Sequence, residues 1–206
     1  MTTRTLLDLK PSEILTHPSN PRRDVGDVTE LAASLKAHGL LQNLVVAPRP
    51  EKMKGPKAAR FVLIAGHRRL AAAKKAKLPT VAAVVDEALT DPADQLSAML
   101  VENGQRADLS PIEEATGYQA LLDLGVTSAQ VAKRVSRPSR HVADRVKLGQ
   151  LPEGVKEQVH THQVSLKEAM AMAQFVGDDK VIKQLTKALG NPYQFEWVVQ
   201  DAQRAR

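Results

Sequence analysis

Five residues between Glu102 and Arg106 carry groups that could bind a metal ion and a phosphate. The segment reads Glu102-Asn103-Gly104-Gln105-Arg106. Carboxylate and amide oxygens are hard ligands that suit Mg²⁺, an ion that proteins usually share with substrate phosphates, and a guanidinium can pair with a phosphate oxygen. Glu102 and Asn103 are therefore candidate metal ligands. The alternative is an ordinary polar helix C-terminus, in which Arg106 interacts with the helix dipole.

A second group of residues could hold a triphosphate. An apolar strand over 61–65 leads through Gly66 into a helix that begins with His67, Arg68 and Arg69. A glycine lets the backbone approach a ligand closely, the first turn of a helix offers unpaired N–H groups to an anion, and guanidinium groups bind phosphate through paired donors. The alternative is a strand–turn–helix with two solvated arginines. The chain has no P-loop signature, so this is not a Walker-type site.

A third group of residues predicts DNA binding. Residues 128–135 form a short predicted helix, 136–138 a turn and 139–149 a second helix, with apolar residues spaced as in a helix-turn-helix. The second helix is basic, and we expect its polar side chains to be exposed and able to reach base edges or phosphates. The candidate DNA contacts are Gln130, Arg137, Ser139, Arg140, His141, Arg145 and Lys147, with a packed or capping role as the open alternative for His141. The alternative is a generic pair of helices with a solvated basic face.

Composition limits the class of protein. The chain has 206 residues, 43% of them hydrophobic, which is enough for one or two globular domains. Its formal net charge of +6 fits a polyanion partner, although a protein that is simply basic would show the same value. There are no cysteines, which excludes disulfides, thiolate catalysis and cysteine-based zinc sites. Because no apolar run is long enough to span a membrane and no signal-peptide core is present, we expect a cytoplasmic protein without a membrane partner.

The order of predicted elements indicates an α+β fold in which a small N-terminal α/β domain precedes an all-α domain. Before residue 90, helices are predicted over 27–38 and 67–77, and strands over 44–47, 60–65 and 80–85. After residue 91, strand signals vanish and helices follow one another. We place the domain boundaries at 1–90 for the α/β domain, 91–176 for a linking helix with the helix-turn-helix, and 177–206 for C-terminal helices.

The ordered segments resemble the ParB family of partition proteins. The segment His17-Pro18-Ser19-Asn20-Pro21-Arg22 is similar to the family's NPxQPR segment, and residues 31–42 are similar to the helix and turn that follow it. Gly66-His67-Arg68-Arg69 is similar to the GERR box, and Glu102–Arg106 is similar to the ENxQR box. Each box is short, but their order and spacing before a helix-turn-helix are specific.

The resemblance implies a CTP-dependent DNA clamp that loads at a palindromic, centromere-like site of a plasmid, phage or chromosome partition system. It implies a nucleotide-binding N-terminal domain, a homodimer, a ParA-type ATPase partner and a place on the nucleoid or a plasmid. By similarity to the boxes, Glu102 and Asn103 would hold Mg²⁺, and Glu102 and His67 would take the catalytic positions. The implied CTP-binding residues are Gly66, Arg68, Arg69, Asn103, Gln105, Arg106, Asn20, Arg22 and Gln42.

Two departures from the family pattern leave alternatives open. His67 stands where the GERR box has a glutamate tied to hydrolysis, and a neutral imidazole cannot replace the charge of a carboxylate, so CTP hydrolysis stays an open expectation. We also expect the residues after 176 to form short helices and not the family's usual C-terminal dimerisation domain, as in a truncated chain or a shorter relative. The alternative function is a helix-turn-helix transcriptional regulator with a non-functional nucleotide domain. A sulfiredoxin-type enzyme is excluded because that chemistry needs a cysteine.

Overall fold

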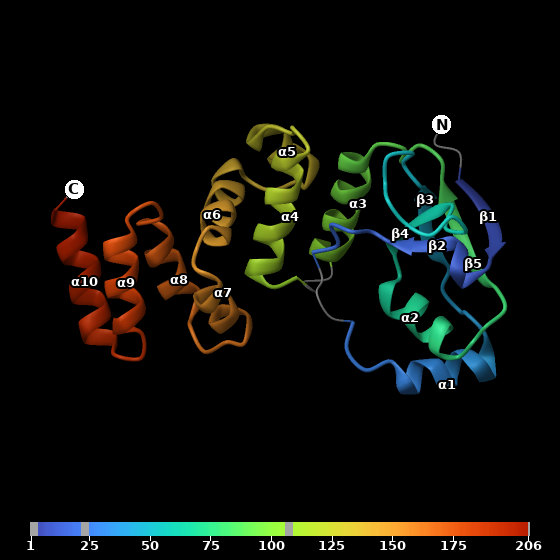
Figure 1. The fold of residues 1–206 in the computed structure, drawn as a ribbon, viewed down its shortest axis with the longest axis horizontal. Helices are drawn as coiled ribbons and strands as arrows, with labels where there is room; N and C mark the ends of the chain where they lie inside the picture. The colour runs from blue at the N-terminus through green and yellow to red at the C-terminus, as the bar shows by residue number, and fades with distance from the viewer. Residues whose placement is uncertain (1–3, 22–24, 106–108, 206) are drawn as a thin grey trace. The chain divides into compact units, whose positions relative to one another are not determined.

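The computed structural model describes residues 4–21, 25–105 and 109–205, although not the side chain of Gln105 (Figure 1). The chain divides into two compact units, the first made of Met1–Asp108 with Leu124–Val126, the second of Leu109–Asp123 with Thr127–Arg206. The first holds the whole described sheet and the second is helical, which confirms the predicted fold class. The domain boundaries that we placed at 90 and 176 stay predictions.

A five-stranded mixed sheet forms the centre of the first unit. Its strands are β1 (Arg4–Leu9), β2 (Ile14–Thr16), β3 (Leu44–Pro48), β4 (Phe61–Ala65) and β5 (Val81–Asp86), in the order β1-β5-β3-β4-β2. The outer pair β1–β5 and the pair β3–β4 are antiparallel, whereas β3–β5 and β2–β4 are parallel. The sequence predicted β3, β4 and β5 but neither β1 nor β2.

Helices pack on both faces of this sheet. The helices α1 (Thr29–His38) and α2 (His67–Lys75) lie side by side (Figure 1) and share a core with one face, through residues such as Leu35, Leu70 and Val46. The helix α3 (Pro92–Gln105) packs on the other face, where Met99 contacts Ile64. The strands therefore alternate between two apolar cores, and a short 3₁₀ turn (Pro11–Glu13) joins β1 to β2.

Seven helices make up the described part of the second unit. They are α4 (Pro111–Asp123), α5 (Ser128–Arg134), α6 (Ser139–Gly149), α7 (Glu153–His160), α8 (Leu166–Ala173), α9 (Asp179–Ala188) and α10 (Pro192–Arg204). Capping boxes at Thr127 and Ser165 begin α5 and α8. The predicted helix-turn-helix corresponds to α5 and α6. None of the helices in the described chain is long and apolar enough to cross a bilayer.

Candidate functional site

Three of the predicted segments meet at one end of the sheet. The strands β2 and β4 are parallel, with Thr16 opposite Leu63, so the residues that follow them leave the sheet at the same end. The strand β3 runs antiparallel to β4, with Val45 opposite Ala65, so the residues before β3 lie there too. Residues 17–20, 42–43 and 66–69 therefore share this end, although they are distant in sequence.

The helix α3 brings the segment that begins at Glu102 toward the same end. Gln95 donates a hydrogen bond of 2.9 Å to the carbonyl of Pro48, which lies opposite the start of β4. Met99, one turn later, packs against Ile64 near the end of β4. Because α3 thus runs in the direction of β4, its next turn, with Asn103, extends past the strand toward Gly66.

Gly66 is a position that only glycine fits well. Its φ of 100° and ψ of 31° lie in the left-handed region, and a Cβ atom there would come within 2.6 Å of Leu44 Cδ2. Leu44 is fully buried, so its side chain has little room to move. The helix α2 begins directly after Gly66, and no side chain caps it. Its first backbone N–H groups can therefore bind an anion.

Both arginines of the second group bind backbone carbonyls. Arg69 Nη1 donates to the carbonyls of Gln42 at 2.7 Å and Asn43 at 2.6 Å. Arg68 Nη2 donates to the carbonyl of Asp27 at 2.9 Å, and its Nη1 donates to Val25. These bonds fix the guanidinium groups beside the start of α2. A guanidinium has five donors, so carbonyl and phosphate contacts are compatible with each other.

His17 is part of this end of the sheet but is buried. Only 3% of its surface is exposed, and burial lowers its pKa from 6.5 to about 4. Its Nδ1 accepts a hydrogen bond of 3.1 Å from the amide of Ser19, and the amide of Asn20 donates to its carbonyl at 3.0 Å. The neutral imidazole therefore shapes the turn that presents Asn20.

The candidate metal ligands are only partly available. Asn103 is 5% exposed and its Nδ2 donates to the carbonyl of Met99 at 2.8 Å, which leaves its oxygen to meet a ligand. Glu102 is half-buried. Within residues 4–21, 25–105 and 109–205, no cluster of three or more His, Cys, Asp or Glu side chains could hold a metal ion. Arg22, Arg106 and the side chain of Gln105 lie outside the described residues.

The helix-turn-helix presents most of its predicted DNA contacts to solvent. Val131 and Ala132 of α5 and Val142 and Leu148 of α6 are buried, and the amide of Arg137 donates to the carbonyl of Ala132 across the turn at 3.0 Å. The exposed candidates are Gln130, Arg137, Ser139, Arg140 and Lys147. Gln130 also uses its side-chain oxygen in the capping box of α5.

The prediction that Arg145 is exposed is wrong, and His141 takes the packed alternative. Arg145 is 15% exposed at its side chain, and its Nε donates to Glu114 Oε2 at 2.7 Å. His141 Nε2 lies 3.4 Å from the same oxygen, and its ring contacts Tyr118 edge-on. The spacing of four residues puts both side chains on the face of α6 that meets α4. The carboxylate of Glu114, which sequence reasoning missed, lets polar groups occupy that face.

Tyr118, which is 2% exposed, shows that water is largely excluded from this contact. Burial raises its pKa to about 12, and the nearby carboxylate of Glu114 adds to the effect. A hydrogen bond or ion pair in such surroundings is stronger than on an open surface. The carboxylate of Glu114 therefore holds α6 on α4 through its bond with Arg145.

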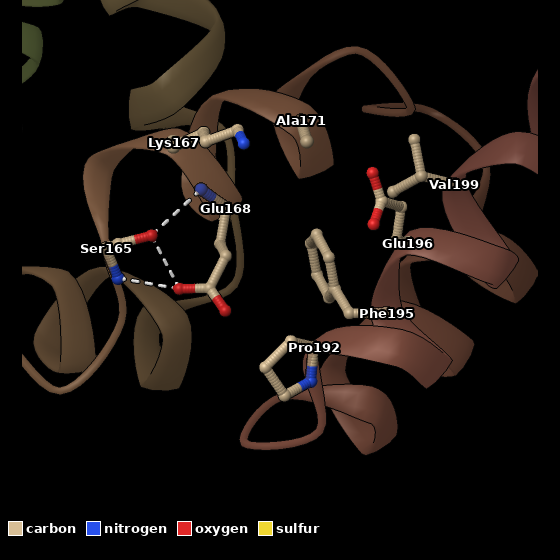
Figure 2. A pocket seen from close by; sticks show the side chains of 8 residues that line it. All are labelled: Ser165, Lys167, Glu168, Ala171, Pro192, Phe195, Glu196 and Val199. Atoms are coloured by element: carbon tan, nitrogen blue, oxygen red, sulfur yellow. Dashed lines mark hydrogen bonds between the residues drawn. The ribbon is translucent and has the colours of Figure 1, made fainter.

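A separate hollow of about 380 Å³ lies between α8 and α10 (Figure 2). Its apolar walls come from Ala171, Pro192, Phe195 and Val199, and its polar walls from Ser165, Lys167, Glu168 and Glu196. Glu168 is held in its capping box, where its carboxylate accepts from the amide of Ser165 at 2.9 Å (Figure 2).

Comparison with known proteins gives matches over both units. The family model of the ParB N-terminal domain matches residues 1–104, and the model of the ParB HTH domain matches residues 107–203. The chain is 39% identical over 172 residues to the chromosome-partitioning protein Spo0J of Thermus thermophilus, which covers 82% of this chain and 60% of that relative. The chain spans between 52% and 68% of the length of the curated relatives compared.

Solved structures give similar matches. The chain is 27% identical to the C-terminally truncated chromosome-partitioning protein ParB from Caulobacter crescentus complexed to the centromeric parS site, with a TM-score of 0.57 over 94% of this chain and 99% of that one. The same truncated protein complexed with CTP-γ-S is 29% identical over 87% of this chain and 98% of that one. Its TM-score of 0.41 is too low for a comparison of nucleotide sites.

Proposed function

Because the chain belongs to the ParB family, we propose that it is a CTP-dependent DNA clamp that loads at a palindromic, centromere-like site of a partition system. The observation that carries this proposal is the meeting of residues 17–20, 42–43 and 66–69 at one sheet end, toward which α3 brings Glu102 and Asn103. The same chain carries a helix-turn-helix with an exposed basic face. A nucleotide site and a DNA-binding element in one chain are the two parts that such a clamp requires.

We infer that the triphosphate of CTP binds at Gly66 and the start of α2. Gly66, in a left-handed conformation, turns the chain from β4 directly into α2, whose first N–H groups can bind a phosphate, and Arg68 and Arg69 are already fixed beside it. Asn20 and Gln42 border the same end of the sheet. Bound Mg²⁺ would supply charge neutralisation for the phosphates. Glu102 and the side-chain oxygen of Asn103 are the described ligands proposed for Mg²⁺. Arg22, Gln105 and Arg106 complete the proposed set of CTP-binding residues.

The DNA contacts in this proposal come from α5, the turn and α6. The parS complex of the Caulobacter protein supports them, because that neighbour shares the fold of the whole chain. Arg137, Ser139, Arg140, Lys147 and Gln130 would face the groove. A palindromic site calls for two copies of the chain, so a homodimer follows from the proposal. A ParA-type ATPase as partner and a location on the nucleoid or a plasmid follow from the family in the same way.

We propose that the nucleotide is held with little turnover. His67 stands where the family has a carboxylate, and a neutral imidazole lacks the charge needed to polarise an attacking water in that role. His67→Glu should therefore raise phosphate release from CTP while CTP affinity stays within a few-fold. Unchanged release in this variant, or rapid release in the original chain, would remove the assignment of His67.

Calorimetric titration tests the nucleotide site. CTP, UTP, ATP and GTP are titrated with Mg²⁺ into the full chain, with and without an operator selected from a DNA library. Only CTP should bind, and Arg69→Ala should weaken it at least about tenfold, equivalent to about 1.4 kcal/mol. Equal binding of all four nucleotides would contradict the preference for CTP. Absent binding of all four would leave the alternative, a helix-turn-helix regulator that does not respond to nucleotide.

Arg49→Ala is a matched control for this titration. Arg49 Nη1 donates to the carbonyls of Pro56 and Ala59, both at 2.7 Å, much as Arg69 binds two carbonyls. It follows Pro48, the residue that ends β3, at the opposite end of the strand from Gln42. Arg49→Ala thus removes equivalent backbone contacts without touching the proposed site and should leave CTP affinity unchanged. If both variants lose CTP equally, the loss reflects folding and not phosphate binding.

A further inference from the structure

A second hollow, of about 360 Å³, lies at the other end of α2. It is formed by the last turn of α2, the residues that follow it and the 3₁₀ turn between β1 and β2. The helix α2 begins directly after Gly66, and Lys74 lies in its last turn. A nine-residue helix of roughly 13 Å therefore separates this hollow from the proposed nucleotide site. Its lining residues are Lys10, Pro11, Ser12, Lys74, Lys77, Leu78 and Pro79.

The charges of this hollow are all positive. Three lysines line it, with no acidic side chain among the lining residues. Glu13, which comes next in the chain, accepts from the amide of Lys10 and pairs with Arg60, and its carboxylate also interacts electrostatically with Lys10. Among the described residues, no carboxylate lies within 4.0 Å of the ammonium groups of Lys10, Lys74 or Lys77.

Lys10, Lys74 and Lys77 are all exposed to solvent, and Lys74 is partly covered by the surrounding protein. Surrounding protein lowers the pKa of Lys74 by desolvation, so its charge lacks part of its water without gaining a counter-charge. Lys77 has a φ of 54°, in the position after a helix where glycine is usual. A lysine in this conformation costs about 1 kcal/mol relative to glycine. The grouping of Lys10, Lys74 and Lys77 around one hollow with no acidic lining residue favours a ligand that supplies negative charge.

We propose that the hollow lined by Lys10, Lys74 and Lys77 binds backbone phosphates of double-stranded DNA, independently of base sequence and separately from the helix-turn-helix. This inference rests on the proposed function, which brings a DNA duplex to the chain. Lysines act as mobile point charges and not as rigid forks, so they suit a polyanion that changes register more than one fixed anion. Because only phosphates are contacted, the site adds affinity without selectivity.

Salt dependence tests this site directly. The full chain without nucleotide is titrated onto a duplex of scrambled sequence at several salt concentrations from about 50 to 300 mM. In Lys10→Gln/Lys74→Gln/Lys77→Asn, where asparagine tolerates the positive φ, the slope of log K against log salt should fall by about 2 to 3. An unchanged slope overturns the proposal.

The control removes the same charge elsewhere. Lys180, Lys183 and Lys187 are exposed on α9, and changing all three to glutamine lowers the net charge from +6 to +3, as the first variant does. The slope should then change by less than about 1. An equal change in both variants would show a general charge effect and overturn the site. If the triple variant folds poorly, Lys10→Gln alone should still lower the slope by about 1.

Other anions are separate outcomes. If inorganic phosphate displaces the duplex where chloride of equal ionic strength does not, the hollow is a small-anion site. If polyglutamate binding, and not DNA binding, is lost in the first variant, the occupant is an acidic protein. Either result overturns the assignment to DNA.

The ratio of operator affinity to scrambled-duplex affinity distinguishes a failure of the hollow proposal from a failure of the proposed function. The hollow variant should weaken operator and scrambled duplex by the same factor and so keep their ratio, whereas Arg137→Ala/Arg140→Ala should lower that ratio. A wild-type chain without operator preference would contradict the proposed function, yet the salt slope would still report on the hollow.

Discussion

Gly66 is the residue at which backbone conformation and ligand binding coincide. Gly66→Ala should destabilise the first unit by about 1 to 3 kcal/mol, because alanine is strained at a φ of 100° and its Cβ would meet buried Leu44. CTP binding should be lost even at temperatures where the variant is folded. Hydrogen exchange of the sheet amides measures the stability of this unit, since the single tryptophan, Trp197, lies in the other unit.

Gly154→Ala is the matched control for that change. Gly154 lies in the first turn of α7 with open space where a Cβ would be, so alanine should stabilise the second unit by about 0.5 kcal/mol. If Gly66→Ala lowers neither the stability nor CTP binding, the nucleotide site does not depend on a glycine at this position.

His17 should make the stability of the first unit pH-dependent. Its imidazole has a pKa of about 6.5 when unfolded and about 4 when folded, so the unfolded chain binds more protons between these values. The stability is therefore complete above pH 6.5 and lost as the pH falls toward 4, by about 2 to 3 kcal/mol. Urea unfolding at pH 7.5 and 4.5, followed by sheet amides, measures the loss.

His17→Asn isolates this contribution from that of the carboxylates. Asparagine keeps an acceptor for the amide of Ser19 but does not titrate. The variant should lose about 2 kcal/mol less than the original chain over the same pH interval. Equal losses in both chains would mean that the folded imidazole is protonated as easily as the unfolded one.

Residue types predicted some contacts of the sites and missed others. Gly66, Arg68 and Arg69 stand out in sequence because a glycine and two arginines at a helix start suit an anion. His141 and Arg145 look identical to exposed groups until α4 supplies Glu114, which lies 31 residues before Arg145. A pattern within one helix cannot show which of its polar faces meets a buried carboxylate on another.

At the scale of elements, the contact of α4 with α6 should separate folding from DNA binding. Arg145→Met leaves Glu114 with fewer partners in dry surroundings, so the second unit should lose about 1 to 3 kcal/mol, measured by thermal unfolding. Arg140, whose side chain is 94% exposed, is the control. Arg140→Met should change stability by less than about 0.5 kcal/mol but weaken operator binding roughly tenfold.

The salt slope of DNA binding decides between the two roles. Arg140→Met should lower the slope by about 1 if the residue contacts a phosphate, and Arg145→Met should leave it unchanged. A lowered slope in Arg145→Met would mean that Arg145 reaches DNA and that its bond to Glu114 opens in the complex.

Strong periodicity made most elements predictable. The predicted helix over 139–149 matches α6, and the strand over 44–47 differs from β3 by one residue. The strand β1 was missed because it lies at the sheet edge, where only Leu9 is buried and the apolar residues do not alternate. The strand β2 has three residues, too few for a period to show.

At the scale of the molecule, the proposed sites are formed by segments that are distant in sequence, so the sequence alone does not show them. Lys10 and Lys74 line one hollow although 64 positions separate them. The meeting of residues 17–20 with 66–69 depends on β2, which the sequence did not predict. The division into a sheet unit and a helical unit was predictable, because strand-forming residues disappear after residue 91.

The central claim is that CTP closes two copies of the chain around DNA, and retention on end-blocked DNA tests it most directly. The chain is loaded onto operator DNA closed at both ends and then washed at about 1 M salt, which abolishes contacts that depend on phosphate charge. With CTP the protein should stay bound until one end is cut, and without CTP it should leave at once. Release at the same rate with and without CTP, or retention that survives cutting, would contradict the account.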